Sequence, residues 1–433
     1  MSGLTDPFMI PYALALGATA FQVGLLSSAR NLLLAVLQLG SGAAVRLMGS
    51  RKAVVLWAAG VQALLWLPLA AVQPLFGNWA VAALIVFYTL GTGAAALGGP
   101  PWGSLIADYV APEERGRYFG RRARLVGFYV TLAGLVAGGV LQLMRGQPVV
   151  GFGLLCAGAF IARTLSWLAL HKIYDGGWKE EPHLKSSFLA FLRAAPHSNY
   201  TRFSLVFASN NFATNIASPF FAVYMLQELK FSYAEYSVII LAGSLTGMLC
   251  SPWWGRLGDR VGNHAVMRWS MAGVVLLPVG WTLFDHPGWL LILNVTGALM
   301  WGGLNLAATN FIYDTVSASQ RHTHMAYFNV VNGMGVSAGA FAGAWVVDSL
   351  GPLGGDTVFF GAFLLSTLLR LVSWLAMQRL VREVRTVRQV GLREVMFDMV
   401  GERLVAVLGY FSVKPEQEQR RKQRRSADVD SEK

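Results

Sequence analysis

Two charged side chains, Asp6 and Arg30, lie inside stretches of sequence that are otherwise apolar. Asp6 stands ten residues before Leu16, where the first stretch ends, and Arg30 stands ten residues after Ala20, where the second begins. At about 1.5 Å per residue, two antiparallel helices place both charges about 15 Å deep, near the middle of a bilayer. A lone charge at this depth costs several kcal/mol, so we expect the two side chains to pair or to face water.

We expect Asp6 and Arg30 to line a central cavity and to act in substrate or proton recognition. An aspartate that exchanges a proton as an arginine approaches and withdraws is a workable proton carrier. The alternative is a static pair that only holds the two helices together.

Amide side chains at helical spacing are the secondary candidates, since uncharged donors in a cavity suit polar or amphipathic solutes. For each single Asn the other interpretation is a hydrogen bond between helices. The amides assigned to the cavity are Asn210, Asn211, Asn215, Asn305, Asn310 and Asn332. Tyr88, Trp102 and Trp301 could bound the same space, or could simply pack.

Other kinds of chemistry lack their sequence signatures. The chain has no phosphate-binding loop, no His, Cys and carboxylate cluster for a metal, and no nucleophile constellation. Its two cysteines, Cys156 and Cys250, stand alone in apolar runs. We therefore expect neither an enzyme nor a bound cofactor, with the proton as the coupling ion.

The elements that must position these residues are membrane helices, because 55% of the residues are hydrophobic and only 13% are charged. That balance lies far outside the usual composition of soluble domains. One short apolar run covers residues 7–16, and eleven runs are long enough to cross a bilayer. The full runs cover residues 20–45, 53–76, 78–106, 124–144, 149–171, 203–227, 233–254, 266–285, 287–313, 326–348 and 356–378.

The chain has a net charge of +12, and its basic residues are concentrated in alternate loops. In the opposite loops the only basic residues are Arg145 and Lys230, and basic loops are retained on the cytoplasmic side. We therefore expect a multi-pass protein of the cell (inner) membrane with twelve spans and both termini in the cytoplasm. Because the basic residues lie in turns between spans, nucleic acid is not an expected partner. The expected partners are a lipid bilayer and a small-molecule substrate. We expect a monomer.

An internal repeat divides the spans into two sets of six. Residues 7–14 (PFMIPYAL) match residues 219–226 (PFFAVYML), and residues 163–169 (RTLSWLA) match residues 370–376 (RLVSWLA). Span seven begins about sixteen residues before Pro219, whereas only six residues precede Pro7. We expect the first span to lack its first half because the start is truncated or misassigned.

The sequence after span eight reads GRLGDRVGNH over residues 255–264. It resembles the G-x-L-x-D-R-x-G signature of the major facilitator superfamily, and twelve spans in two repeated halves are similar to that family over residues 1–380. The resemblance implies an all-α polytopic fold of two pseudo-symmetric six-helix bundles. It also implies that this segment, with tight turns at Gly258 and Gly262, acts as a gate between the halves. In the first half the acidic position of the signature is Arg46, which departs from the family pattern.

The segment after span four resembles the family's loop between spans four and five, and Asp314 and Arg321 align with its Asp108 and Arg115. Both aspartates stand at helix C-termini, where the helix dipole disfavours an unpaired carboxylate. We expect Asp108 to pair with Arg163 and Asp314 with Arg370; the alternative is arginines that only extend toward the interface. The full set assigned to gating is Gly255, Gly258, Asp259, Arg260, Gly262, Asp108, Arg115, Arg163, Asp314 and Arg370.

The domain boundaries follow from these patterns. We expect an N-terminal half at 1–171, a cytoplasmic loop at 172–202, a C-terminal half at 203–378, a basic amphipathic helix at 379–412 and a disordered tail at 413–433.

The function predicted from the sequence is secondary transport of a small organic solute by alternating access, driven by protons. Two alternatives stay open: a non-transporting receptor or partner-binding protein on the same scaffold, and a lipid scramblase.

Overall fold

The computed structural model describes residues 1–110, 114–175, 188–317, 321–350 and 357–384. The described residues form helices joined by short turns, with no strand among them. The first half contains α1 (Ser2–Thr5), α2 (Met9–Ala15), α3 (Ala20–Leu39), α4 (Ser41–Met48), α5 (Arg51–Ala70), α6 (Val72–Phe76), α7 (Ala80–Tyr109), α8 (Arg115–Leu143) and α9 (Pro148–Leu170). The second half contains α10 (Phe188–Arg193), α11 (Asn199–Ala217), α12 (Phe220–Val223), α13 (Tyr233–Val261), α14 (Asn263–Val275), α15 (Leu277–Gly280), α16 (Pro287–Thr315), α17 (Arg321–Leu350) and α18 (Thr357–Leu380).

Twelve membrane segments result, the first of them shorter than the rest, as the hydropathy pattern predicts. Within the described residues, nine helices are long and apolar enough to span a bilayer. The other three crossings are broken helices: α1 with α2, α11 with α12, and α14 with α15. Each break contains a proline, at Pro7, Pro219 or Pro278, and a proline lacks the N–H that would continue the helical hydrogen bonds.

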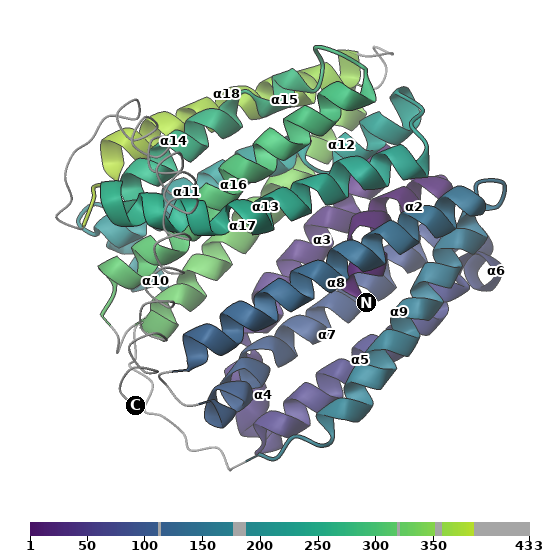
Figure 1. Ribbon diagram of the computed structural model, residues 1–433, viewed down its shortest axis with the longest axis horizontal. Helices are drawn as coiled ribbons and strands as arrows, with labels where there is room; N and C mark the ends of the chain where they lie inside the picture. The colour runs from purple at the N-terminus through teal and green to yellow at the C-terminus, as the bar shows by residue number, and fades with distance from the viewer. Residues whose placement is uncertain (111–113, 176–187, 318–320, 351–356, 385–433) are drawn as a thin grey trace, which may run out of the picture.

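The two sets of helices form two bundles, which Figure 1 shows as α4–α9 on one side and α11–α18 on the other. The bundles meet along two helix pairs, α3 with α17 and α8 with α13. Small residues permit the first approach, since a Cβ on Gly24 would overlap Ala344 and one on Gly333 would overlap Ala35. Glycine at these positions lets the backbones of α3 and α17 pack closely.

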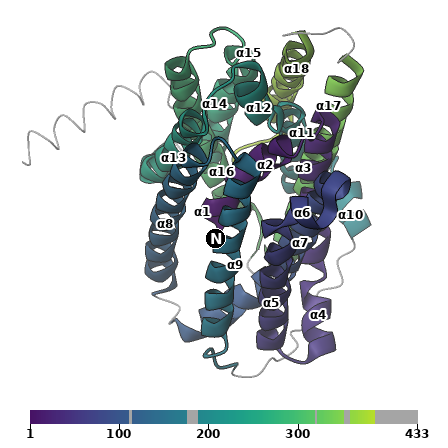
Figure 2. The same cartoon turned by 90° about the vertical axis from the view of Figure 1, so that its right-hand side faces the viewer.

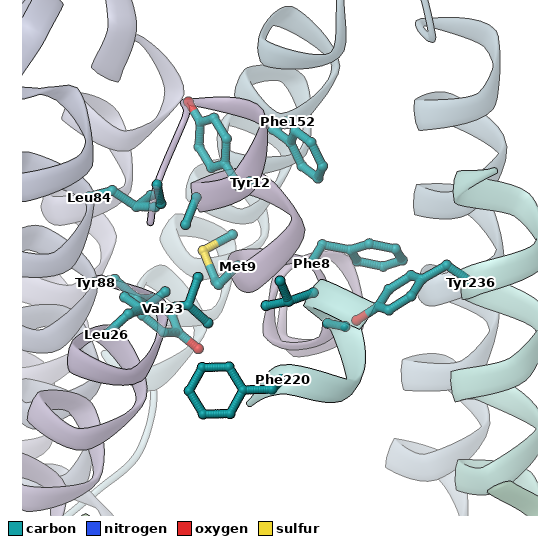
Figure 3. Packing of buried hydrophobic residues seen from close by; sticks show 14 of the residues in the cluster. Phe8, Met9, Tyr12, Val23, Leu26, Leu84, Tyr88, Phe152, Phe220 and Tyr236 are labelled. Atoms are coloured by element: carbon teal, nitrogen blue, oxygen red, sulfur yellow. The ribbon is translucent and has the colours of Figure 1, made fainter. Parts of the chain in front are cut away.

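One end of the molecule, here called the arginine-rich end, carries the turns at residues 46–52 and 262–264 and the ends of α7, α9 and α18. At the opposite end one apolar core joins both halves. It contains Phe8, Tyr12 and Phe152 of the first half with Phe220 and Tyr236 of the second, as Figure 3 shows. The second buried cluster lies at the arginine-rich end, and its residues, from Phe191 to Val381, all belong to the second half. The described part of the chain thus has a shared core at one end only.

The segment assigned to a loop after span eight is mostly helical, because α13 continues to Val261. Gly262 makes the turn with φ of 89°, as predicted, and Gly49 makes the corresponding turn in the first half with φ of 66°. The prediction of a turn at Gly258 is wrong: Gly258 lies in α13, buried against Asn263.

The two ends of the chain differ in how far the structure describes them. Met1 lies at mid-height of the bundle in Figure 2, and α1 packs on α8 and α9. The predicted basic helix at 379–412 and the tail at 413–433 fall, from residue 385 onward, outside the described residues.

Candidate functional site

Tyr88 of α7 connects the two deep charges, Asp6 and Arg30. Its hydroxyl donates to Asp6 Oδ1 over 3.5 Å, and the Arg30 guanidinium carbon lies 5.5 Å from the centre of its ring. Asp6 and Arg30 make no direct ion pair. The structure thus brings the two residues to one aromatic ring.

Helix breaks and packing set this geometry. Asp6 is the first residue of the short 3₁₀ turn Asp6–Phe8, which joins α1 to α2, so it lies at a break between two regular helices. Tyr88 is buried, tilted against Trp66 at a centroid distance of 6.2 Å. Figure 3 shows Val23 and Leu26 of α3 beside it. Its phenol oxygen is therefore held in place by apolar neighbours, which suits it to position a charge.

Both charged side chains have groups that are not used in contacts with the described residues. The Asp6 side chain is exposed although it lies midway along a crossing. Arg30 is half-buried, and its Nε is buried with no hydrogen-bond partner in the described part of the chain. Burying a guanidinium nitrogen without an acceptor is costly, so Arg30 is an energetically expensive residue at this position.

Farther along α7, toward the arginine-rich end, part of the helix surface is open. A Cβ added at Gly99 or Gly103 would meet nothing within 4 Å. The repeat aligns these glycines with Asn305 and Thr309 of α16, since Asp108 aligns with Asp314 at the same offset, and both side chains are exposed. Asn305 is thus exposed, and its assignment to the cavity stays a prediction.

The other amide candidates differ from Asn305. Asn211 Nδ2 donates to Asn332 Oδ1 over 2.8 Å, which joins α11 to α17, and Asn215 donates to the Asn211 carbonyl. Asn210 is only 1% exposed, and its Nδ2 has no partner within the described residues. Asn310 is half-buried. The Asn211–Asn332 contact therefore matches the alternative interpretation, a hydrogen bond between helices.

Arg51 organises the arginine-rich end of the first half. Its Nη2 lies 2.7 Å from Asp108 Oδ2 and 3.3 Å from Asp175 Oδ1, and its Nη1 donates to Ser104. Asp175 also accepts from the Ser50 hydroxyl and from the Lys52 backbone N–H. Burial opposes ionisation of Asp175, but these hydrogen bonds and the Arg51 charge outweigh it and hold the pKa of the carboxyl below its ordinary value.

The second half builds a related arrangement from different residues. Asn263 Nδ2 donates to Asp314 Oδ2 over 2.7 Å, and the His264 backbone N–H donates to Glu383 Oε2 over 2.8 Å. Asp259 and Arg260 are exposed at the end of α13. Gly255 lies in the same helix, next to Leu306 of α16.

The predicted pairing of Asp108 with Arg163 and of Asp314 with Arg370 is wrong. Both arginines lie within the membrane helices, Arg163 seven residues and Arg370 ten residues before the helix ends. Arg370 is 2% exposed and donates to the Val274 carbonyl over 2.9 Å and to the Thr214 carbonyl. Arg163 Nε is buried without a partner in the described residues. The side chain of Arg115 lies outside the described residues.

The sequence analysis missed Arg51, Asp175, Asn263 and Glu383 as members of these networks. Two signals were present: Arg51 and Asn263 each directly follow a turn that contains a glycine, and Asp175 and Glu383 each follow the last span of a half. Within the described residues, no three His, Cys, Asp or Glu side chains gather to hold a metal.

Comparisons with known proteins agree with this architecture. The chain matches 154 residues of the tetracycline resistance protein, class B, of Escherichia coli with 26% identity, which is 36% of each chain. The match thus spans about a third of that relative's length.

Solved structures match over nearly the whole chain. A nucleoside transporter, NupG, has 15% identity, covers 88% of this chain and 96% of its own, and has a TM-score of 0.66. A D-xylose-proton symporter has 11% identity, covers 89% and 94%, and has a TM-score of 0.65. A bacterial homologue of the iron transporter ferroportin, in an inward-facing state, has 15% identity, covers 86% and 95%, and has a TM-score of 0.61. At these identities the similarity concerns the fold.

The family model described as Major Facilitator Superfamily matches residues 1–199 and 203–417. With apolar helices in two related bundles, the chain is a multi-pass membrane protein, and the family it matches is one of transporters rather than enzymes. The chain belongs to the Major Facilitator Superfamily of membrane transporters.

Proposed function

We propose that this protein is a secondary transporter that moves a small organic solute by alternating access and couples the movement to protons. The observation that carries the proposal is the exposed carboxylate of Asp6, held midway through the membrane by Tyr88 and next to Arg30, which has no ion-pair partner among the described residues. A charge at this depth is costly unless it serves a substrate or ion pathway.

The packing of the two halves supports an alternating mechanism. Their shared apolar core lies at the end opposite the arginine-rich end, where the second half has a cluster of its own. We infer that the structure is open at the arginine-rich end, and that the halves rock about α3–α17 and α8–α13 to close it. Small residues along α3 and α17 suit such motion because they present few side chains that must separate.

The networks at the arginine-rich end are the proposed gate. The contacts of Arg51 with Asp108 and of Asn263 with Asp314 both lie within one half. Closing would bring Asp259 and Arg260 of α13 toward the first half, where their charges could bind across the interface. Gly262 turns the chain directly after α13, and Gly258 lets Asn263 pack against the end of that helix.

Charge asymmetry sets the proposed orientation. The arginine-rich end faces the cytoplasm of a cell whose inner membrane holds the protein, which acts as a monomer without nucleic acid. The partial similarity to a tetracycline resistance protein supports an organic compound as cargo.

The test is substrate-dependent proton flux in proteoliposomes loaded with a pH-sensitive dye. Pooled metabolites and lipophilic cations are added outside, and internal pH is followed for the wild type, Asp6→Asn and Asp348→Asn. Asp348 is the matched control, an exposed acid two residues from the end of α17. We expect one pool to drive acidification that Asp6→Asn abolishes and Asp348→Asn retains. Solute movement without proton flux would refute the coupling, and no movement of any pool by folded protein would refute transport.

A further inference from the structure

We propose that the substrate carries a negative charge, such as a carboxylate, and that Arg30 binds this charge. The proposal rests on the transport function above and names the chemical class of the substrate at that same site.

The first step is the unused capacity of Arg30. A guanidinium presents five N–H donors in a planar fork that matches a carboxylate. The described residues supply Arg30 with the face of one ring, at 5.5 Å, and leave its buried Nε without an acceptor. The two Nη groups of Arg30 are not among the fully buried atoms and donate to no acceptor in the described residues, so a carboxylate bound to them would neutralise the charge.

The second step decides between an anion and a cation, since Asp6 could attract a cationic substrate. A carboxyl group can become neutral by binding a proton, whereas an arginine stays charged in a protein. The permanent charge therefore needs the permanent counterion. Among the described residues every other acid lies at or near a helix end, so Asp6 is the one carboxylate at this depth, and it makes no ion pair with Arg30.

The third step concerns the exposed side chains of the second half. On α16, the helix that the repeat aligns with α7, Asn305 and Thr309 are exposed, polar and uncharged. These groups can hydrogen-bond a substrate and cannot neutralise Arg30 in its place.

The fourth step concerns proton coupling. Before binding, the positive charge of Arg30 and the negative charge of Asp6 balance. When an anion binds Arg30 and a proton binds Asp6, the site again has no net charge. An anion and a proton would therefore cross together, without moving net charge through the membrane.

The experiment uses the purified full chain in detergent and two series that share a carbon skeleton. One is benzoate, benzylamine and benzyl alcohol; the other is hexanoate, hexylamine and hexanol. The shift in thermal unfolding midpoint against concentration gives an apparent Kd for each compound. The variants are Arg30→Gln, Arg30→Lys and the control Arg122→Gln, whose guanidinium carbon lies 4.2 Å from the Trp102 ring centre in α7.

We expect the carboxylates to stabilise the protein more than the amines and alcohols. Arg30→Gln should weaken their binding at least tenfold, Arg30→Lys should weaken it less, and Arg122→Gln should leave it unchanged. Three results would overturn the proposal: stronger stabilisation by the amine or the alcohol, carboxylate binding that persists in a folded Arg30→Gln, or no stabilisation by either carboxylate.

Transport of the same compounds in proteoliposomes separates this proposal from the general function. Uptake of an amine that does not depend on Arg30 would refute anion recognition and leave secondary transport standing. Carboxylate binding through Arg30 with no carboxylate, amine or alcohol transported would refute transport and leave anion recognition standing.

Discussion

Asp175 and Glu383 occupy equivalent places in the two halves of the molecule. Asp175 accepts a hydrogen bond from the backbone N–H of Lys52, the second residue of α5, and Glu383 accepts one from His264, the second residue of α14. Each acid follows the last crossing of its half and binds the N-terminus of that half's third crossing. A carboxylate there accepts hydrogen bonds from unpaired helix N–H groups and is attracted by the positive end of the helix dipole. The repeat thus preserves this acid, while the first-half Arg51 is replaced by Asn263.

Replacing Asp175 by Asn should lower the free energy of unfolding by about 1–2 kcal/mol at neutral pH, because hydrogen bonds to a charged acceptor are lost. The pKa of Asp175 is depressed in the folded protein. Its contribution is therefore complete above the unfolded value of about 4 and disappears as pH falls through the lower folded value. Thermal unfolding from pH 7 to 3 should show the two proteins converging only below about pH 4. A difference that stays constant to pH 3 would contradict an ionised Asp175.

Arg51→Gln should destabilise the arginine-rich end of the first half by about 1–3 kcal/mol, since one side chain contacts α7 and the segment after α9. The Asp108 side chain is 56% exposed, so we attribute most of the effect to Asp175, whose side chain is 13% exposed. Chemical unfolding in detergent measures the loss. The control is Arg124→Gln, an exposed arginine of α8, which should change stability little. Equal effects of both substitutions would show that Arg51 acts only as a surface charge.

Arg370 and Pro278 should be energetically coupled. In an uninterrupted helix the Val274 carbonyl would accept from residue 278, and Pro278 has no N–H, whereas Arg370 Nη1 donates to that carbonyl over 2.9 Å. Arg370→Met should therefore be less damaging in a Pro278→Ala background, by about 1 kcal/mol, because the alanine supplies a replacement donor. A double-mutant cycle by thermal unfolding measures the coupling. Arg163→Met, in the other half, should show none.

Gly24→Val should destabilise this conformation by about 1–3 kcal/mol, because its side chain would overlap Ala344 where α3 meets α17. Gly99→Ala is the matched control, since a Cβ at Gly99 meets nothing within 4 Å. In Gly24→Val the unfolding midpoint and the solute uptake should both fall. In Gly99→Ala the unfolding midpoint should change little. Wild-type stability of Gly24→Val would show that the halves pack differently in solution.

Tyr88→Phe separates the two contacts of the ring. The phenylalanine keeps a face for Arg30 and loses the hydroxyl that donates to Asp6. Because that hydrogen bond is 3.5 Å long, stability should fall by less than about 1 kcal/mol. We expect proton flux to fall more than solute binding, measured in the dye-loaded proteoliposomes and by thermal shift. A loss of binding equal to that in Arg30→Gln would assign the tyrosine to the substrate.

The sequence by itself determined the membrane fold, its twelve segments and their division into two repeated halves. These depend on hydropathy, length and spacing, which are properties of each segment alone. The tertiary structure decided which groups meet: that Tyr88 stands between Asp6 and Arg30, that Asp108 binds Arg51, and that Arg370 binds backbone carbonyls. Those partners depend on how each helix is rotated and where its neighbours approach. Side-chain packing between distant segments fixes both, so the spacing along one helix could not reveal them.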